Sequence, residues 1–228
     1  MKLFVIEGVD GSGKSTQIRL LNEYFTGKGY RCEYLHFPRT DAPFFGELIA
    51  RFLRGEFGSL EEVNPWLVAM LYAGDRKDAA ELIGNWLKKG SIVLLDRYTY
   101  SNIAYQCAKL SSPEDQEKLM KWITDLEFRH FNIPKPGINI FLDVPFSFID
   151  KKLSASRTGE DRRYLNGTRD IHEESLSFQK KVREMYVKVS QIDDRLCLVD
   201  CNDDKGEILP PEKIFTRIIK IIAESNLL

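Results

Sequence analysis

The chain has 228 residues, of which 43% are hydrophobic and 29% are charged, and its formal net charge is −1. A chain of this length can bury one substantial core, and its composition is that of an ordinary globular protein. The nearly neutral charge argues against a general nucleic-acid-binding protein, and no apolar stretch approaches the roughly 20 residues that cross a bilayer. We therefore expect a single cytoplasmic domain over residues 1–228 that binds neither nucleic acid nor membrane.

Short apolar runs alternate with longer helical patterns along the chain. The apolar runs predict strands at residues 2–7, 31–37, 92–96, 138–144 and 196–200. Periodicity and capping residues predict helices at residues 14–28, 44–53, 65–88, 101–110, 113–129, 146–156, 170–191 and 211–225. Because strands that alternate with helices form parallel sheets covered on both faces, we predict a doubly wound, three-layer α/β/α fold with a five-stranded parallel sheet.

The first predicted strand leads into the sequence Gly8-Val9-Asp10-Gly11-Ser12-Gly13-Lys14-Ser15-Thr16, a phosphate-binding P-loop that begins a helix. Its glycines let successive N–H groups point at phosphate oxygens, and the helix that follows presents its positive dipole end to the same anion. Lys14 supplies a mobile positive charge for the outer phosphates. The residues expected to hold a nucleoside triphosphate are Gly8, Asp10, Gly11, Ser12, Gly13, Lys14, Ser15 and Thr16.

Asp96 ends the third apolar run in the manner of a Walker B aspartate. At the carboxyl edge of a parallel sheet it would face the P-loop, where its carboxylate could hold Mg²⁺ directly or through water. The hydroxyl of Ser15 is the second expected metal ligand. The alternative is an ordinary aspartate at the end of a strand. The adjacent, oppositely charged Arg97 favours the phosphate and metal site.

Four further segments carry a resemblance to a known family. Residues 96–106 resemble the DRYxxSxxAYQ signature of thymidylate kinases, and Phe37-Pro38-Arg39 resembles the FPR element of that family. Residues 71–76 resemble its helical segment LFxx[DN]R, and residues 141–145 match its later strand exit. Together with the P-loop these segments follow the order of the family over nearly the whole chain. The chain therefore resembles the thymidylate kinases, which are P-loop nucleoside monophosphate kinases.

The resemblance implies Mg²⁺-dependent transfer of the γ-phosphoryl group of ATP to dTMP, giving ADP and dTDP in the synthesis of dTTP. It places Arg39 and Arg97 on the 5′-phosphate of dTMP, which a guanidinium can grip with parallel hydrogen bonds. It places Tyr72 against the face of thymine, where the family usually has Phe, and Arg76 on the O4 atom of the base. The other residues that it assigns to dTMP are Asp10, Phe37, Ser101, Asn102 and Tyr105.

The chemistry of these residues leaves alternatives open. Arg97 could form an ion pair with the neighbouring Asp96, and Arg39 could be a solvated loop residue. Tyr72 could simply pack in the core. Within the family pattern, Asp10 corresponds to an acidic residue near the 3′-hydroxyl of the acceptor sugar. Asn102 corresponds to a position that contacts the base directly or through water, and Tyr105 to an aromatic residue under the sugar.

Residues 156–168, which are rich in charge and glycine, resemble the mobile lid of the family. Gly11 occupies the P-loop position that carries an arginine in one subgroup, so the resemblance moves that charge to the lid. Such a charge neutralises the transferring phosphoryl group. The expected catalytic residues are therefore Lys14, Arg97, Arg157 and Arg162. The resemblance also implies a homodimer.

Three other functions share part of this sequence pattern. A P-loop kinase that acts on a nucleoside or on another monophosphate would use the same donor chemistry. A GTPase switch is less compatible, because Asp143-Val144-Pro145 stands where a guanine-binding motif would follow the fourth strand. A catalytically silent nucleotide-binding regulator would be expected to lose Lys14, Asp96 or Arg97, and all of them are present.

Overall fold

The computed structural model describes residues 2–154, 164–165, 170–172, 175–225 and 227. Within these residues, one parallel five-stranded sheet has the order β2-β3-β1-β4-β5. The chain leaves β1 toward one edge of the sheet and leaves β4 toward the other, so the carboxyl ends of these two strands form the topological switch point at which open α/β sheets bind ligands. The strands are β1 (Leu3–Glu7), β2 (Cys32–His36), β3 (Ile92–Asp96), β4 (Ile138–Asp143) and β5 (Leu196–Asp200).

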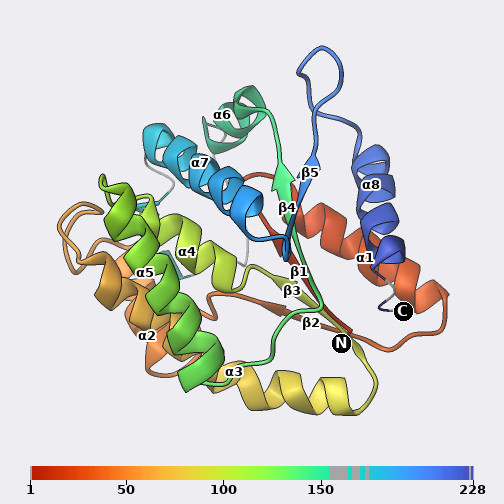
Figure 1. Cartoon of the computed structure of the whole chain (residues 1–228), viewed down its shortest axis with the longest axis horizontal. Coiled ribbons are helices and arrows are strands. Elements are labelled where there is room, and N and C mark those ends of the chain that lie inside the picture. The colour runs from red at the N-terminus through yellow and green to blue at the C-terminus, as the bar shows by residue number, and fades with distance from the viewer. Residues whose placement is uncertain (1, 155–163, 166–169, 173–174, 226, 228) are drawn as a thin grey trace.

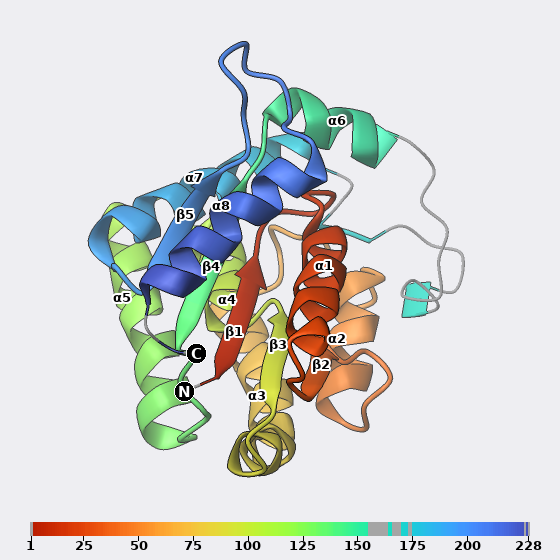
Figure 2. The ribbon, with the colours of Figure 1, turned by 90° about the vertical axis from the view of Figure 1, so that its right-hand side faces the viewer.

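Helices cover both faces of the sheet, as Figures 1 and 2 show. One face carries α1 (Lys14–Gly27) and α8 (Pro211–Glu224). The other face carries α2 (Phe45–Leu53), α3 (Pro65–Lys88), α4 (Thr99–Cys107), α5 (Pro113–Asp125) and α7 (Leu176–Ile192). The short helix α6 (Phe146–Ser154) follows β4, and a π-helical turn, η1 (Leu126–His130), extends α5. The predicted three-layer architecture is confirmed.

The central strands are buried on both sides because their side chains alternate between two helical layers. Phe4 of β1 stacks on Phe25 of α1 with ring centres 5.6 Å apart. On the opposite face, Phe141 of β4 stacks on Tyr186 of α7 at 4.5 Å. The strands therefore read as continuous apolar runs, and for that reason their positions could be predicted to within one residue at each end.

Three helical segments differ from the prediction. Helix α4 begins at Thr99 instead of residue 101, because the buried carboxylate of Glu7 on β1 accepts hydrogen bonds from the N–H groups of Tyr98 and Ser101. Helix α7 begins after Ser175, whose hydroxyl accepts from the N–H of Phe178, and residues 170–172 belong to a turn instead. The predicted helix over residues 113–129 divides into α5 and η1.

Two connecting segments follow β5 and α6 in the chain. Residues 201–211 form a short hairpin in which Asn202 pairs with Ile208, seen as the loop above β5 in Figure 1. Most of the predicted lid, including Arg157 and Arg162, lies outside the described residues. No helix in the described part of the chain is long and apolar enough to cross a membrane.

Candidate functional site

The P-loop connects β1 to α1 at the carboxyl edge of the sheet. Gly11 and Gly13 adopt left-handed backbone conformations, with φ of 78° and 86°, which side chains with a Cβ rarely tolerate. A Cβ atom on Gly8 would lie 2.5 Å from the Oγ atom of Ser12, so the side chain of Ser12 would have to move to admit a larger residue there. The loop thus curls closely enough for its N–H groups to surround an anion. Thr16 lies in the first turn of α1 that follows.

Lys14 folds back over this loop. Its Nζ atom donates to the carbonyl oxygens of Gly8 at 3.3 Å and Val9 at 3.1 Å. Burial lowers the pKa of Lys14 to about 8; the nearby positive charge of Arg97 also lowers it, and Asp96 opposes the shift. Among the described residues, the amine donates hydrogen bonds to neutral oxygens alone, and a polyphosphate anion would be a stronger partner.

Arg97, which follows β3, reaches across to the P-loop. Its Nη2 atom donates to Oδ1 of Asp10 at 2.7 Å and to the hydroxyl of Tyr105 at 3.1 Å, and its Nη1 atom donates to Oγ of Ser101 at 3.1 Å. The Tyr105 hydroxyl donates to Oδ2 of Asp10 at 2.7 Å, and Nε2 of Gln179 donates to the same oxygen at 3.0 Å. The structure therefore brings together the P-loop, the DRY segment and α7.

This network fixes the charges of its members. Burial alone would raise the pKa of Asp10, but Arg97 and Lys14 outweigh it and hold that pKa well below its usual range. Arg97 itself has a positive φ of 67°, an unusual backbone for a residue with a side chain, which aims it at the loop. The alternative ion pair between Arg97 and Asp96 is not the one found, because the guanidinium pairs with Asp10.

Asp96 and Ser15 are the residues that could hold Mg²⁺. Asp96 is buried, and its Oδ1 atom has no hydrogen-bond partner among the described residues. Its Oδ2 atom lies 3.4 Å from Nδ1 of His36, whereas Ser15 is exposed in the first turn of α1. A free carboxylate oxygen and a hydroxyl are the hard ligands that Mg²⁺ prefers, and phosphates and water would complete its shell.

Glu7, at the end of β1, accepts hydrogen bonds from the start of α4. Its carboxylate accepts from the N–H of Tyr98 at 2.9 Å, from Oγ of Ser101 at 2.5 Å and from the hydroxyl of Tyr186 at 2.9 Å. Burial raises the pKa of Glu7, and the hydrogen bond from Ser101 opposes that rise. Because Ser101 also contacts Arg97, Glu7 supports the arginine indirectly.

Arg39 is fixed by Asp75 of α3. Its Nε atom donates to Oδ1 of Asp75 at 2.8 Å, its N–H donates to Oδ2 at 2.9 Å, and Nη2 donates to the backbone oxygen of the same residue at 2.8 Å. The alternative of a solvated loop arginine does not fit, because the side chain is only 19% exposed. The preceding Phe37 is buried against Tyr98, with ring centres 5.7 Å apart.

Arg76, which follows Asp75 on α3, is also held by a carboxylate. Its Nε and Nη2 atoms each donate at 2.6 Å to the carboxylate of Glu127 on η1. Asn102 donates to the same carboxylate at 3.1 Å. Tyr72 is partly buried, and its pKa is raised mainly by burial and by Asp170, while Arg97 and Arg76 oppose the rise. Tyr72 therefore lies in the electrostatic field of both arginines.

The sequence reasoning missed several residues of this region. Asp75, Glu127 and Gln179 each hold a predicted site residue, but they come from other segments of the chain. His172, also missed, is buried with its ring centre 5.0 Å from that of Tyr105. Two of them left a signal: Asp75 occupies the [DN] position of the segment 71–76, and Glu127 falls in the buried phase of the predicted helix 113–129, four residues after Ile123.

Several known proteins are similar to this chain over most of its length. The family model described as thymidylate kinase matches residues 6–209. A protein of Thermococcus kodakarensis named "Probable thymidylate kinase" is 30% identical, covering 96% of this chain and 95% of its own length. The thymidylate kinase of Mycobacterium tuberculosis is 31% identical over 82% and 85%. A solved thymidylate kinase from Candida albicans, 24% identical, covers 97% of this chain and 91% of its own with a TM-score of 0.70, and so shares the fold.

Proposed function

This chain belongs to the thymidylate kinase family, and from that membership we propose how its residues carry out the reaction. It is a nucleoside monophosphate kinase that transfers a phosphoryl group from ATP to dTMP, giving ADP and dTDP. The observation that carries the residue assignments is the 2.7 Å contact between Arg97 and Asp10. It joins the residue that would hold the phosphate of dTMP to the loop that would hold ATP.

On the donor side, the P-loop amides would bind the phosphates of ATP, and Lys14 would move from the loop carbonyls to the outer phosphates. Phosphate binding would keep the Lys14 amine protonated, because the negative charge of the phosphates raises the pKa that burial lowers. Asp96 and Ser15 would hold Mg²⁺, which supplies further neutralisation of phosphate charge when bound. The free Oδ1 atom of Asp96 supports this assignment.

On the acceptor side, Arg97 and Arg39 would hold the 5′-phosphate of dTMP. One of its oxygens would attack the γ-phosphorus of ATP in line, as the bond from that phosphorus to the β,γ-bridging oxygen breaks and ADP leaves. No general base is needed, because a phosphate monoester with a second pKa near ~6 is already ionised at neutral pH. The protein contributes alignment and charge neutralisation.

The nucleoside of dTMP would lie between the P-loop and α3. Tyr72 would stack on the thymine, and Arg76 would donate to its O4 atom, with Asn102 beside it. Tyr105 would lie under the sugar and crowd a ribose 2′-hydroxyl. Its bonded partner Asp10 would then reach the 3′-hydroxyl.

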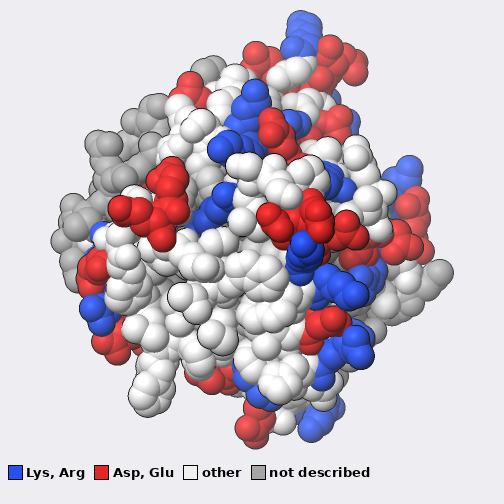
Figure 3. All heavy atoms as spheres, turned by 60° about the vertical axis from the view of Figure 1, so that its left-hand side comes forward, with Lys and Arg blue, Asp and Glu red and all other residues white. Residues whose placement is uncertain are grey.

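We also propose a role for the lid, a homodimeric assembly and a cytoplasmic location. Arg157 and Arg162 would bring positive charge over the transferring phosphoryl group when the lid closes, which would also exclude water. The protein would act as a cytoplasmic homodimer, as the family resemblance implies. Leu67 and Met70, exposed on α3, favour a dimer, and Figure 3 shows a broad uncharged area on the side that carries α2, α3 and α5.

The test is ADP release with ATP and a panel of acceptors: dTMP, dUMP, dCMP, dGMP and thymidine. We expect dTMP to give the highest kcat/KM and thymidine to give none, since it lacks the phosphate. Arg97→Met should lower kcat/KM for dTMP by at least about a hundredfold. The matched control is Arg129→Met, an exposed arginine paired with Asp125. A folded Arg97 variant within a few-fold of the wild type would refute the acceptor-phosphate assignment.

A further inference from the structure

Glu127 is a fully buried carboxylate for which the proposed mechanism has no task. Its two oxygens accept hydrogen bonds from three residues on two helices: Arg76 on α3, and Thr99 and Asn102 on α4. We propose that Glu127 is a positioning residue that fixes which way the site donates and accepts hydrogen bonds toward the base of the acceptor nucleotide. This inference rests on the proposed placement of the base beside Arg76.

Glu127 orients the guanidinium of Arg76. It turns its Nε and Nη2 edge to Glu127, where two parallel hydrogen bonds of 2.6 Å hold it. A guanidinium has only donors, so the edge turned away from the carboxylate, which carries Nη1, also offers donors. The carboxylate therefore sets both the orientation of Arg76 and the place where its free N–H groups point.

Glu127 and the backbone of α3 orient the amide of Asn102. Its Nδ2 atom donates to the backbone oxygen of Ala69 at 3.0 Å and to Oε1 of Glu127 at 3.1 Å, so both of its hydrogens have acceptors. Its Oδ1 atom is buried and has no hydrogen-bond partner among the described residues. An amide cannot rotate away from two acceptors without losing both bonds, so Oδ1 is presented as an acceptor.

Arg76 and Asn102 together give the site a fixed order of hydrogen-bond donor and acceptor. Arg76 and Asn102 donate to the same oxygen of Glu127, so they lie side by side, one offering a donor and the other an acceptor. A pyrimidine with a 4-oxo group and an N3–H group presents the complementary order. Cytosine presents the reverse order, because its 4-amino group would meet the guanidinium donors and its N3 lone pair would meet Oδ1 of Asn102.

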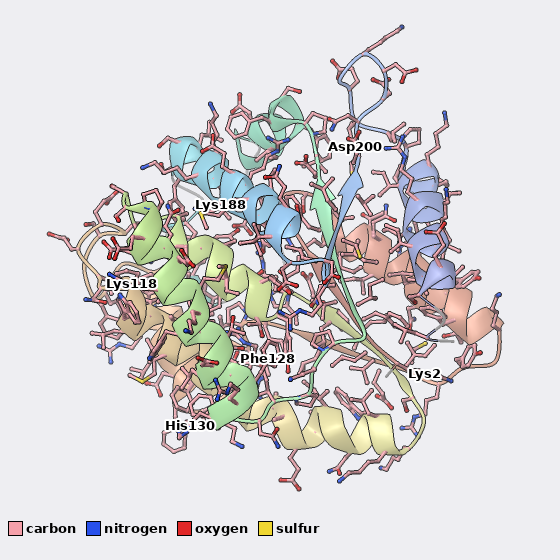
Figure 4. All side chains as sticks on the ribbon, viewed as in Figure 1. Lys2, Lys118, Phe128, His130, Lys188 and Asp200 are labelled. Carbon is pink, nitrogen blue, oxygen red and sulfur yellow. The ribbon has the colours of Figure 1, made fainter. Side chains whose placement is uncertain are left out.

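The local structure explains how an acidic side chain comes to lie there. Leu119 and Ile123 of α5 are buried, and the π-helical turn places Glu127 on that same buried side. Figure 4 labels Phe128 and His130 of this turn, at the end of α5 opposite Lys118. The hydroxyl of Thr99 donates to Oε2 of Glu127 at 2.8 Å and holds the carboxylate from the start of α4. π-Helical turns are rare and often mark functional positions.

The experiment compares kcat/KM for dTMP and dCMP in the full-length protein, with Glu127→Gln and Glu127→Asp as variants. Glutamine keeps the shape but replaces one acceptor oxygen with a donor. Aspartate keeps the charge that neutralises Arg76 but is one methylene too short to reach both partners. The matched control is Glu117→Gln, an exposed glutamate on α5. Circular dichroism and thermal unfolding establish that each variant is folded.

For wild type we expect kcat/KM for dTMP to exceed that for dCMP by at least about a hundredfold. Both Glu127 variants should lower this ratio about tenfold or more, mainly through a higher KM for dTMP, with kcat changed by no more than about threefold. The control should leave the ratio unchanged. If Glu127→Gln does not fold, Glu127→Asp alone decides the question, because it keeps the buried negative charge.

Other results separate the possible failures. A Glu127 variant that loses activity equally toward dTMP and dCMP, or Glu127→Asp with wild-type selectivity, would show that the carboxylate only balances charge, which overturns the inference. A wild-type protein that uses dCMP as well as dTMP would overturn the order of donor and acceptor itself. Absence of any activity toward dTMP in the wild type would refute the proposed function instead.

Discussion

The proposed donor and acceptor sides of this site are built in different ways. The proposed donor side is one continuous loop, residues 8–16, whose backbone would supply most of the binding groups. The acceptor side consists of arginines from separate segments, each held by a carboxylate from elsewhere in the chain: Arg39 by Asp75, Arg76 by Glu127 and Arg97 by Asp10. The hydrogen-bond partners of Lys14, the cation of the proposed donor side, are carbonyl oxygens alone within the described part of the chain.

This difference separates two kinds of residue. A cation without a charged partner is held ready for its ligand and contributes little to the folded state. A cation paired in the interior is part of the folded structure, because removing its partner leaves a buried charge. Substitutions on the donor side should therefore affect activity alone, whereas substitutions of the acceptor-side carboxylates should affect both activity and stability.

The largest expected effect is on the donor side. Lys14→Met should lower kcat by at least about a thousandfold, because the transferred phosphoryl group loses its main protein cation. The free energy of unfolding should not fall, since the variant removes a buried amine whose pKa burial lowers to about 8. Steady-state ADP release and urea unfolding measure the two quantities. Lys118→Met, on the exposed face of α5, is the control. Loss of stability in Lys14→Met would contradict the comparison.

The acceptor side should respond differently. Asp75→Asn should lower the free energy of unfolding by about 2–4 kcal/mol, because Arg39 loses the buried carboxylate that holds it. The KM for dTMP should rise at the same time. Urea unfolding at pH 7 and acceptor titrations test this, with Asp78→Asn, exposed on the same helix, as the control. Equal urea midpoints for the two variants would mean that the pair contributes no stability.

Lys109 provides a test of the comparison, because it is a partly buried lysine whose Nζ atom is buried and to which the proposed mechanism assigns no ligand. Its Nζ atom lies 4.7 Å from the ring centre of Phe52 and has no hydrogen-bond partner among the described residues. Burial lowers its pKa from 10.5 to about 7. Between these values the unfolded chain binds the extra proton, so stability must rise with pH across that range.

Lys109→Met should remove part of that pH dependence. The wild-type protein should gain about 1–3 kcal/mol of unfolding free energy between pH 6 and pH 9, and the variant should gain less and be the more stable of the two at pH 6. Urea unfolding at both pH values provides the measurement. Lys121→Met, which replaces an exposed lysine of α5, should keep the wild-type slope. An identical slope in the Lys109 variant would exclude a depressed pKa.

The smallest expected effect concerns a single hydroxyl. Tyr105→Phe keeps the aromatic ring but removes the bonds to Asp10 and Arg97, a change of about 1 kcal/mol. KM for dTMP should rise about fivefold, with little change in the KM for ATP, because the lost bonds lie on the acceptor side. Tyr30→Phe, which precedes β2 at the other end of the sheet, is the control. A larger rise in the KM for ATP than in the KM for dTMP would place Tyr105 on the donor side instead.

The sequence by itself determined the features that depend on neighbouring residues. The P-loop could be predicted because its glycines, lysine and hydroxyls are contiguous, and the three central strands could be predicted because both of their faces are apolar. The motifs that contain Arg39, Arg76 and Arg97 are equally local, which is why the family resemblance was visible before the fold. The order of strands and helices followed from the same patterns.

Only the tertiary structure decided which carboxylate holds each arginine. The partners Asp10, Asp75 and Glu127 lie 87, 36 and 51 residues from Arg97, Arg39 and Arg76. The start of α4 was likewise set by Glu7, from a strand more than ninety residues earlier in the chain. Side-chain pairs of this kind have no periodicity or fixed spacing, because the fold determines which elements meet. The sequence therefore specified the cations of the site, and packing chose the charges that hold them.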